Sequence, residues 1–172
     1  SACLLSRSSD LAIKDATVIV PDQYPDFLTW MPNSEKIVRY DKHREKCDML
    51  FKIADLIVCL DFNTPSRVEE MQQALVNSPA HKILIDHHLK PDVDADLIIS
   101  QPEASSTCEL VFRIVWQMGA FVRLTKAFAI PVYCGMMTDT GGFTFNSSRP
   151  EIFFIISEIA RSEERRVGKE CR

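Results

Sequence analysis

The stretch KILIDHHLKPD, Lys82–Asp92, decides how the rest of the chain is read. Its first four residues, Lys82–Ile85, suit a buried β-strand, and the DHH triplet Asp86–His88 follows directly. Pro91 then restricts regular structure beyond the histidines. A strand that ends in a carboxylate and two imidazoles brings polar groups to one point, and this pattern indicates a functional site.

A second apolar run shows the same arrangement. Leu56–Leu60 reads as a buried strand, and the triplet Asp61–Asn63 (DFN) follows it. In an open parallel sheet, ligands bind beyond the carboxyl ends of the strands. A third carboxylate, Asp139, lies in the polar, glycine-bearing loop Thr138–Asn146, which follows the apolar stretch Leu124–Met137. We therefore expect these segments to contribute to one site.

Predicted strands and helices alternate along the rest of the chain. The predicted strands are Ala16–Val20, Ile37–Tyr40, Leu56–Leu60, Lys82–Ile85 and Asp96–Ile99. The predicted helices are Lys42–Ala54, Ser66–Asn77, Thr107–Met118, Leu124–Met137 with a kink at Pro131, and Glu151–Ala160, while Ser1–Asp15 reads as weakly helical. This order predicts an α/β domain with a doubly wound, mainly parallel sheet and helices on both faces.

Three local expectations refine this pattern. Met49, Leu50 and Ile53 are expected to face inward from their helix. A capping box of Ser66 with Glu69 is expected to start the next helix, and Ser106 is expected to cap the helix after it.

Composition sets broad limits. A chain of 172 residues, 46% of them apolar, is long enough for one domain with a substantial core. It contains no apolar run of membrane-spanning length and no signal-peptide pattern. Six cysteines without a CxxC pair favour buried thiols in a reduced cytoplasm over a disulfide framework. The expected location is therefore cytoplasmic.

The last twelve residues, 161–172, resemble the translation of a sequencing-adapter oligonucleotide, and we exclude them from fold reasoning. The alternative is a genuine charged end of the preceding helix. This segment holds five of the 20 basic and three of the 24 acidic residues, so the remaining body has a net charge of −6. An acidic body argues against binding an extended nucleic-acid duplex, but a small anion held by metal ions remains compatible with it.

The candidate site suits metal-dependent hydrolysis of phosphate esters. Neighbouring side chains on a strand point in opposite directions, so of His87 and His88 one reaches a metal and the other a substrate phosphate. Asp86 is placed to accept a hydrogen bond from an imidazole. Carboxylate and imidazole donors without thiolates suit Mn²⁺, with Mg²⁺, Co²⁺ or Zn²⁺ as competitors. Gly141 and Gly142 allow close backbone approach and can offer N–H groups to an anion.

Simpler explanations exist for each feature alone. A carboxylate after a strand is more often a turn residue than a ligand, and a pair of histidines lies more often on a surface than in a site. Arg67 suits phosphate binding and an exposed helix position equally well. The chain has no GxxxxGK[ST], GxGxxG or GxSxG motif, so P-loop, dinucleotide-binding and serine-hydrolase functions have no support.

Three motifs in this order resemble the DHH phosphoesterases, and within them the bacterial bifunctional oligoribonucleases and pAp phosphatases (nano-RNases). These motifs are LDFN at 60–63, IDHH at 85–88 and GMMTDTGGF at 135–143, and the resemblance spans residues 1–160. It implies a DHH domain that removes 5′-mononucleotides from short oligoribonucleotides or the 3′-phosphate from pAp. A homodimer is left open.

The resemblance also implies roles for individual residues. Asp61 would bridge two Mn²⁺ ions, and His87 and Asp139 would bind the second ion. His88 would face the substrate phosphate, and with Asp86 it forms the candidate catalytic pair. The remaining candidate substrate-binding residues are Asn63, Arg67, Gly141 and Gly142.

Two departures from the family pattern matter. A His-x-x-Pro-Asp-Gly-Asp-like motif is absent before the strand at 16–20, and the glycine-rich DHHA1 domain is absent after the helix at 151–160. Residues 1–160 are therefore expected to be a partial DHH domain that binds metal weakly and can be inactive by itself. The alternatives are a cyclic-dinucleotide phosphodiesterase, a manganese pyrophosphatase, and a non-catalytic module that binds metal or nucleotides.

Overall fold

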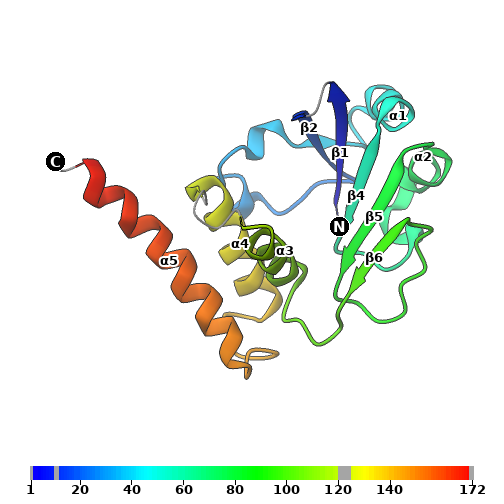
Figure 1. Ribbon diagram of the computed structural model, residues 1–172. Coiled ribbons are helices and arrows are strands. Elements are labelled where there is room, and N and C mark those ends of the chain that lie inside the picture. The colour runs from blue at the N-terminus through cyan, green and yellow to red at the C-terminus, as the bar shows by residue number, and fades with distance from the viewer. Residues whose placement is uncertain (1, 10–11, 120–124, 171–172) are drawn as a thin grey trace. The chain divides into compact units, whose positions relative to one another are not determined.

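The computed structural model describes residues 2–9, 12–119 and 125–170 (Figure 1). The chain divides into two compact units, Ser1–Pro102 and Glu103–Arg172. The first unit holds the sheet and the second holds three long helices.

The sheet of the first unit has six strands in the order β3-β2-β1-β4-β5-β6. The strands are β1 Ala2–Ser9, β2 Ala12–Val20, β3 Val38–Arg39, β4 Leu56–Leu60, β5 His81–Asp86 and β6 Leu97–Ser100. The pairs β2–β3, β4–β5 and β5–β6 are parallel, whereas β1 is antiparallel to both β2 and β4. The predicted α/β class is confirmed, and the sheet is mixed because of β1.

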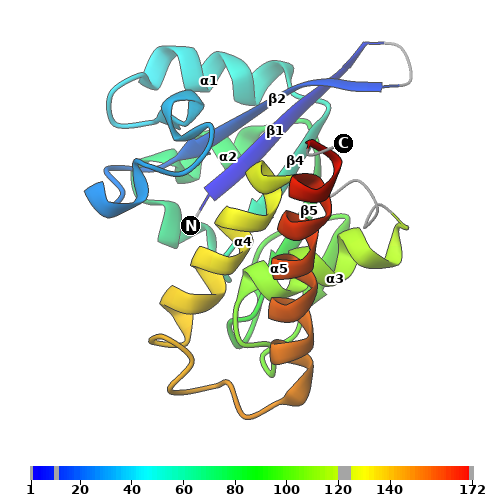
Figure 2. The ribbon, with the colours of Figure 1, turned by 90° about the vertical axis from the view of Figure 1, so that its left-hand side faces the viewer.

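The expectation that Ser1–Asp15 is weakly helical is wrong. Residues 2–9 form β1, and β2 begins at Ala12, so these strands run side by side in opposite directions (Figure 2). Cys3 and Leu5 are buried, and they face the same core as Ile57 and Cys59 of β4. Pairing on both edges of β1 therefore overrides the weak local preference for helix.

Helices α1 (Arg44–Ile53) and α2 (Gln72–Asn77) lie on the same face of this sheet (Figure 1). The core-facing residues of α1 are Cys47 and Phe51, which are 0% and 1% exposed. Of the three predicted inward positions, Leu50 is partly buried and packs against the core, whereas Met49 and Ile53 are exposed. The predicted face of this helix is therefore right at Leu50 and wrong at the other two positions. Which helices cover the other face of the sheet stays a prediction.

The predicted capping box at Ser66 is also wrong. A 3₁₀ segment, η3 (Pro65–Met71), precedes α2, and Thr64 stands at its N-cap without a side-chain capping bond. Glu69 has a φ of 49°, outside the helical region, so it breaks the predicted continuous helix. Val68 and Met71 are fully buried and anchor this segment to the core. Two further short 3₁₀ segments are η1 (Asp26–Leu28) and η2 (Ser34–Lys36).

The second unit consists of α3 (Thr107–Gln117), α4 (Lys126–Asp139) and α5 (Pro150–Glu170), which pack against one another. Their shared core is apolar: Phe112, Ala129, Val132, Met136, Ile152, Ile155 and Ile159. Ser106 caps α3 as predicted, because its side chain accepts the N–H of Glu109 at 3.1 Å. Helix α5 continues through residue 170, and a foreign origin for 161–172 stays a prediction. Among the described helices, none is long and apolar enough to cross a membrane.

Candidate metal centre

Asp61 stands immediately after β4 in an unusual backbone conformation. Its φ is 65°, in the left-handed region that Asp tolerates better than most residues. Its N–H still donates to the carbonyl of Ile85 at 3.2 Å, which extends the β4–β5 pairing by one residue. The backbone thus turns at a point that the sheet itself holds in place.

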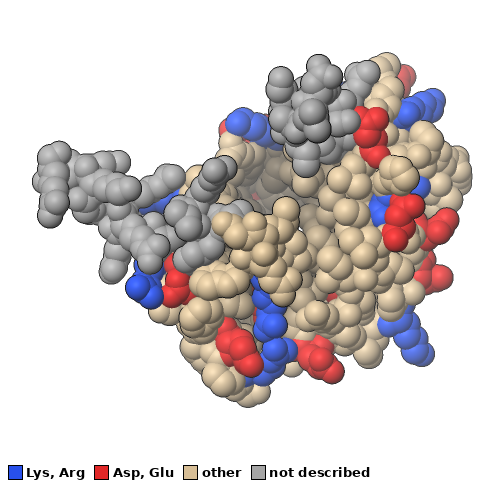
Figure 3. All heavy atoms as spheres, viewed as in Figure 1, with Lys and Arg blue, Asp and Glu red and all other residues tan. Residues whose placement is uncertain are grey.

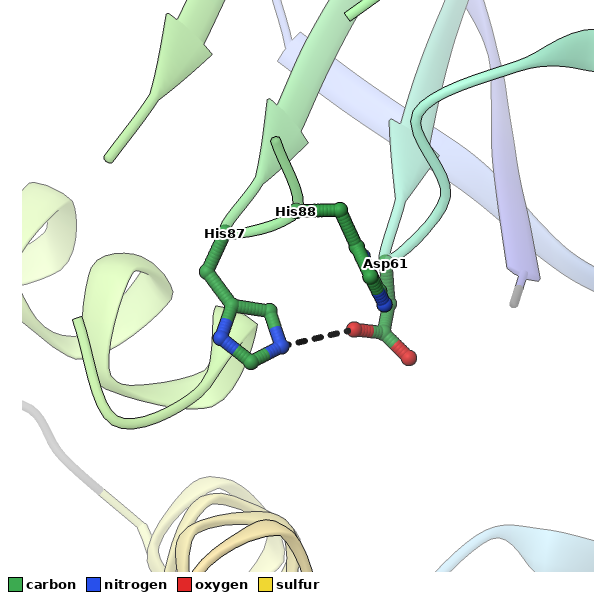
Figure 4. Close-up of side chains that lie close together, drawn as sticks. All are labelled: Asp61, His87 and His88. Carbon is green, nitrogen blue, oxygen red and sulfur yellow. Dashed lines mark ion pairs between the residues drawn. The ribbon is translucent and has the colours of Figure 1, made fainter. Parts of the chain in front are cut away.

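His87 follows β5 directly, and the parallel pairing of β4 with β5 brings it to the same edge as Asp61. His87 Nε2 lies 3.7 Å from Asp61 Oδ1 (Figure 4). One donor atom from each of Asp61, His87 and His88 can be chosen so that all lie within 4.8 Å of one another. The structure therefore brings these three predicted site residues together.

Asp86 is the last residue of β5, and its side chain is completely buried. It accepts two hydrogen bonds from His88. One comes from the backbone N–H to Oδ2 at 3.1 Å, and the other joins His88 Nδ1 to Oδ1 at 2.7 Å. Asp86 therefore fixes the orientation of an imidazole, as the sequence suggested.

The loops after β4 and β5 are tied to each other. Asn63 Nδ2 donates to the carbonyl of Leu89 at 2.7 Å, and the N–H of Asp92 donates to the carbonyl of Asn63 at 2.6 Å. Arg67 extends from η3 and places Nη1 3.0 Å from His88 Nε2. Asn63 therefore has a clear structural role, while substrate binding by Asn63 and Arg67 stays a prediction.

The donor set fits a divalent cation. Two ligand atoms about 2.1 Å from one tetrahedral ion lie about 3.4 Å apart, close to the 3.7 Å between His87 Nε2 and Asp61 Oδ1. Asp61 is partly exposed, with a side-chain accessibility of 40%, so water can reach this edge of the sheet. A carboxylate with imidazoles accommodates Mn²⁺, Co²⁺ or Zn²⁺.

The thiols near this edge are unsuited to metal binding. Cys3 of β1 pairs in register with Cys59 of β4, and both side chains are fully buried as free cysteines. A hydrogen bond with Cys59 and burial raise the pKa of Cys3 well above its ordinary value. A thiol with a raised pKa is a poor metal ligand, so Cys3 does not suit a metal site.

Asp139 and the two glycines belong to the second unit. Asp139 is the exposed last residue of α4. The Gly141 N–H donates to Thr138 O at 3.3 Å and the Gly142 N–H to Met137 O at 2.8 Å, which is the Schellman pattern that closes a helix. The visible role of these N–H groups is to cap α4. Metal binding by Asp139 and anion binding by Gly141 and Gly142 stay predictions.

Thr140, which was not among the predicted site residues, has a structural role in this loop. Its buried hydroxyl donates to the carbonyl of Met136 at 2.7 Å and accepts the N–H of Phe143 at 3.0 Å. The feature of the sequence that could have indicated this role is a threonine at the end of a helix, immediately before two glycines. Thr140 thereby fixes the backbone that follows Asp139.

Charged side chains are mixed on the visible face of the molecule. Figure 3 shows acidic and basic groups interspersed along the margin of the first unit. Arg44 pairs with Glu70, and Arg39 pairs with Asp41 at 2.6 Å. On the part of this face that the structure describes, positive charge forms no continuous stripe that could follow a duplex backbone.

A family model for the DHH family, N-terminal domain, matches residues 1–136. The bifunctional oligoribonuclease and PAP phosphatase NrnA of Thermus thermophilus is 29% identical over 135 residues, which cover 76% of this chain and 39% of that protein. The cyclic-di-AMP phosphodiesterase GdpP of Bacillus subtilis is 32% identical over 95 residues, which cover 54% of this chain and 14% of that protein.

A solved structure is also similar to this chain. It is an exopolyphosphatase-related protein from Bacteroides fragilis, with a TM-score of 0.82 and 52% identity. The match covers 83% of this chain and 42% of that one. The chain therefore spans less than half the length of these relatives.

Proposed function

The chain belongs to the DHH family, and from this premise we propose that it supplies the metal-binding core of a phosphoesterase that acts on short nucleotides. One observation carries the proposal: Asp61 and His87, from the ends of adjacent parallel strands, approach to 3.7 Å beside His88. Helix-capping or turn roles would explain each residue singly, but they would not explain this convergence.

In the proposal, Asp61 and His87 hold a divalent cation, and Asp139 is a further ligand. The proposed ion is Mn²⁺, in a pair of ions in the complete protein, with Mg²⁺ or Co²⁺ as alternatives. When bound, such ions supply an activated water and stabilise charge on the phosphoryl oxygens.

The protein residues orient the phosphate in this proposal. His88 is held by Asp86, so its imidazole offers a fixed edge to a phosphate oxygen. Arg67 contributes a guanidinium, which matches the geometry of phosphate. Asn63 holds the two loops in register and stands within the same segment as Asp61. Gly141 and Gly142 complete the proposed substrate-binding set.

The proposed substrates are short oligoribonucleotides and pAp, because the NrnA relative covers most of the chain. A cyclic dinucleotide is the second candidate, favoured by the 32% identity to the cyclic-di-AMP phosphodiesterase GdpP. The free cysteines of the described residues are compatible with a cytoplasmic location, which belongs to the same proposal.

An assay separates these candidates. Product release from pAp, a labelled trinucleotide and cyclic-di-AMP is measured with and without Mn²⁺. We expect Asp61→Asn to abolish Mn²⁺-dependent release, whereas Asp94→Asn, at an exposed site in the same unit, leaves it unchanged. Equal Mn²⁺-dependent release by Asp61→Asn and the wild type, above the level measured without Mn²⁺, would refute the proposal. Tight Mn²⁺ binding without release from any substrate would favour a non-catalytic module.

A further inference from the structure

The two adjacent histidines at the metal centre have different partners. The His87 Nε2 faces a carboxylate oxygen of Asp61 at 3.7 Å. The His88 ring lies between an acceptor and a cation, with Asp86 Oδ1 2.7 Å from Nδ1 and Arg67 Nη1 3.0 Å from Nε2. This asymmetry bears on which histidine can bind a metal.

The contacts of His88 define its tautomer. A guanidinium has donors and no acceptor, so the bond from Arg67 requires a lone pair on His88 Nε2. The ring proton then stands on Nδ1 and is donated to the buried carboxylate of Asp86. The lone pair of the ring is thus occupied by Arg67, and a positive charge stands directly beside it.

The position of Arg67 is built into the fold. Its backbone N–H donates to Thr64 O at 3.1 Å, and the next residue, Val68, is fully buried. The loop that carries Arg67 is also tied to the loop that carries His88 through Asn63 and Leu89. The backbone that carries the exposed guanidinium is therefore anchored, and Arg67 Nη1 lies 3.0 Å from His88 Nε2.

We infer that Arg67 determines which histidine joins the metal. It occupies Nε2 of His88 and excludes that imidazole from the cation's ligands, which leaves His87 to bind the cation beside Asp61. His88 thereby stays outside the set of metal ligands, and the guanidinium of Arg67 keeps further donors that can face a substrate phosphate. The inference rests on the proposed function, since it assumes a divalent cation at this edge of the sheet.

Proximity alone would not separate the two histidines. One donor atom of His88 lies within 4.8 Å of the chosen donor atoms of Asp61 and His87, so a small movement would bring it to a common ion. Without Arg67, the lone pair on His88 Nε2 would be available to a metal ion. The hydrogen bond from His88 Nδ1 to Asp86 would then favour metal binding through Nε2. Arg67 is therefore a positioning residue: it acts on metal coordination by keeping His88 Nε2 away from the cation.

The test counts the histidines that bind Co²⁺, with the metal alone as the probe. Each coordinated imidazole gives a hyperfine-shifted, exchangeable N–H signal in the proton NMR spectrum of the Co²⁺-loaded protein. We expect one such signal from this site in the wild type, from His87, and a second in Arg67→Ala. Arg67→Lys, which keeps a charged donor, should retain the single signal.

Two control variants test whether the second signal comes from His88 and depends on Arg67. Arg44→Ala removes another exposed arginine from the same unit and should leave one signal. The double variant Arg67→Ala/His88→Gln should lose the second signal, which assigns that signal to His88. Co²⁺ affinity of the four combinations of Arg67→Ala and His88→Gln separates this effect from the simple loss of a positive charge.

The possible failures are distinguishable. If Co²⁺ binds and Arg67→Ala gives the same signals as the wild type, the inference about Arg67 is overturned and the metal centre stands. If both histidines already give signals in the wild type, the inference about Arg67 is likewise overturned and the metal centre stands. If no variant binds Co²⁺, the metal centre is overturned and the inference with it.

Discussion

His87 and Asp61 meet across the ends of two neighbouring parallel strands, with His87 Nε2 3.7 Å from Asp61 Oδ1. Their backbones are held in register by the β4–β5 pairing and by the Asp61 N–H bond to Ile85. The approach of the two side chains thus follows from the register of the sheet.

Removing either side chain should weaken metal binding. We expect Asp61→Asn and His87→Gln to reduce Mn²⁺ affinity by about tenfold or more, since each removes one of the proposed ligands. Asp139→Asn should have a similar effect if Asp139 is a ligand. Calorimetric titration with Mn²⁺ gives the affinities, and Asp94→Asn is the matched control. An unchanged affinity in Asp61→Asn would exclude this carboxylate as a ligand.

Replacing Asp86 should affect both stability and His88. Asp86→Ala leaves the backbone N–H and Nδ1–H of His88 without their acceptors, at a cost of about 1–3 kcal/mol in unfolding free energy. Asp86→Asn keeps part of the acceptor capacity and should cost less. Urea unfolding measures the difference. Equal stability of Asp86→Ala and the wild type would show that water replaces the carboxylate without penalty.

Tyr40 should make the protein less stable at high pH. Burial and the hydrogen bond to Asp48, 2.6 Å long, raise the pKa of Tyr40 to about 12. The unfolded chain loses this proton near pH 10, so the stabilisation is complete below pH 10 and is lost as the pH rises toward 12. The expected loss is about 2 kcal/mol of unfolding free energy. Urea titrations at pH 9 and pH 12 should show a smaller decrease for Tyr40→Phe than for the wild type.

Gly135 should be a site where alanine destabilises a helix. In the middle of α4, alanine normally favours the helix by about 1 kcal/mol over glycine. Here a Cβ would stand 2.2 Å from the Cys108 sulfur and 3.1 Å from its Cβ, so α3 and α4 would be forced apart. We expect Gly135→Ala to cost about 1–3 kcal/mol, measured by urea unfolding. The pair Gly135→Ala/Cys108→Ala should recover most of that loss, and a lack of recovery would mean that the Cys108 contact is not the cause.

The convergence at the metal centre was accessible from sequence for a simple reason. Asp61 and His87 each follow a short apolar run, and parallel strands place such positions at one edge. The role of Asp86 as a hydrogen-bond acceptor was predictable because the N–H of a neighbouring imidazole needs an acceptor. The tie between Asn63 and Leu89 was not predictable, because it joins an amide to a backbone carbonyl that carries no sequence signal.

The errors arose where distant contacts decide local structure. β1 forms because β2 and β4 flank it, and β4 comes much later in the chain. In α1, Met49 and Ile53 are apolar residues four positions apart, as are Cys47 and Phe51, so two faces competed. The sheet covers the face with Cys47 and Phe51, and this choice depends on tertiary packing.

The central place of β1 sets the order in which the sheet can be completed during synthesis. Among the strands of this sheet, β1 is translated before the others, and its second neighbour, β4, follows only after the intervening segments and α1. Until then the nascent β1–β2 hairpin has an open edge that other chains can join. Ribosomal stalling before residue 56 would therefore favour aggregation.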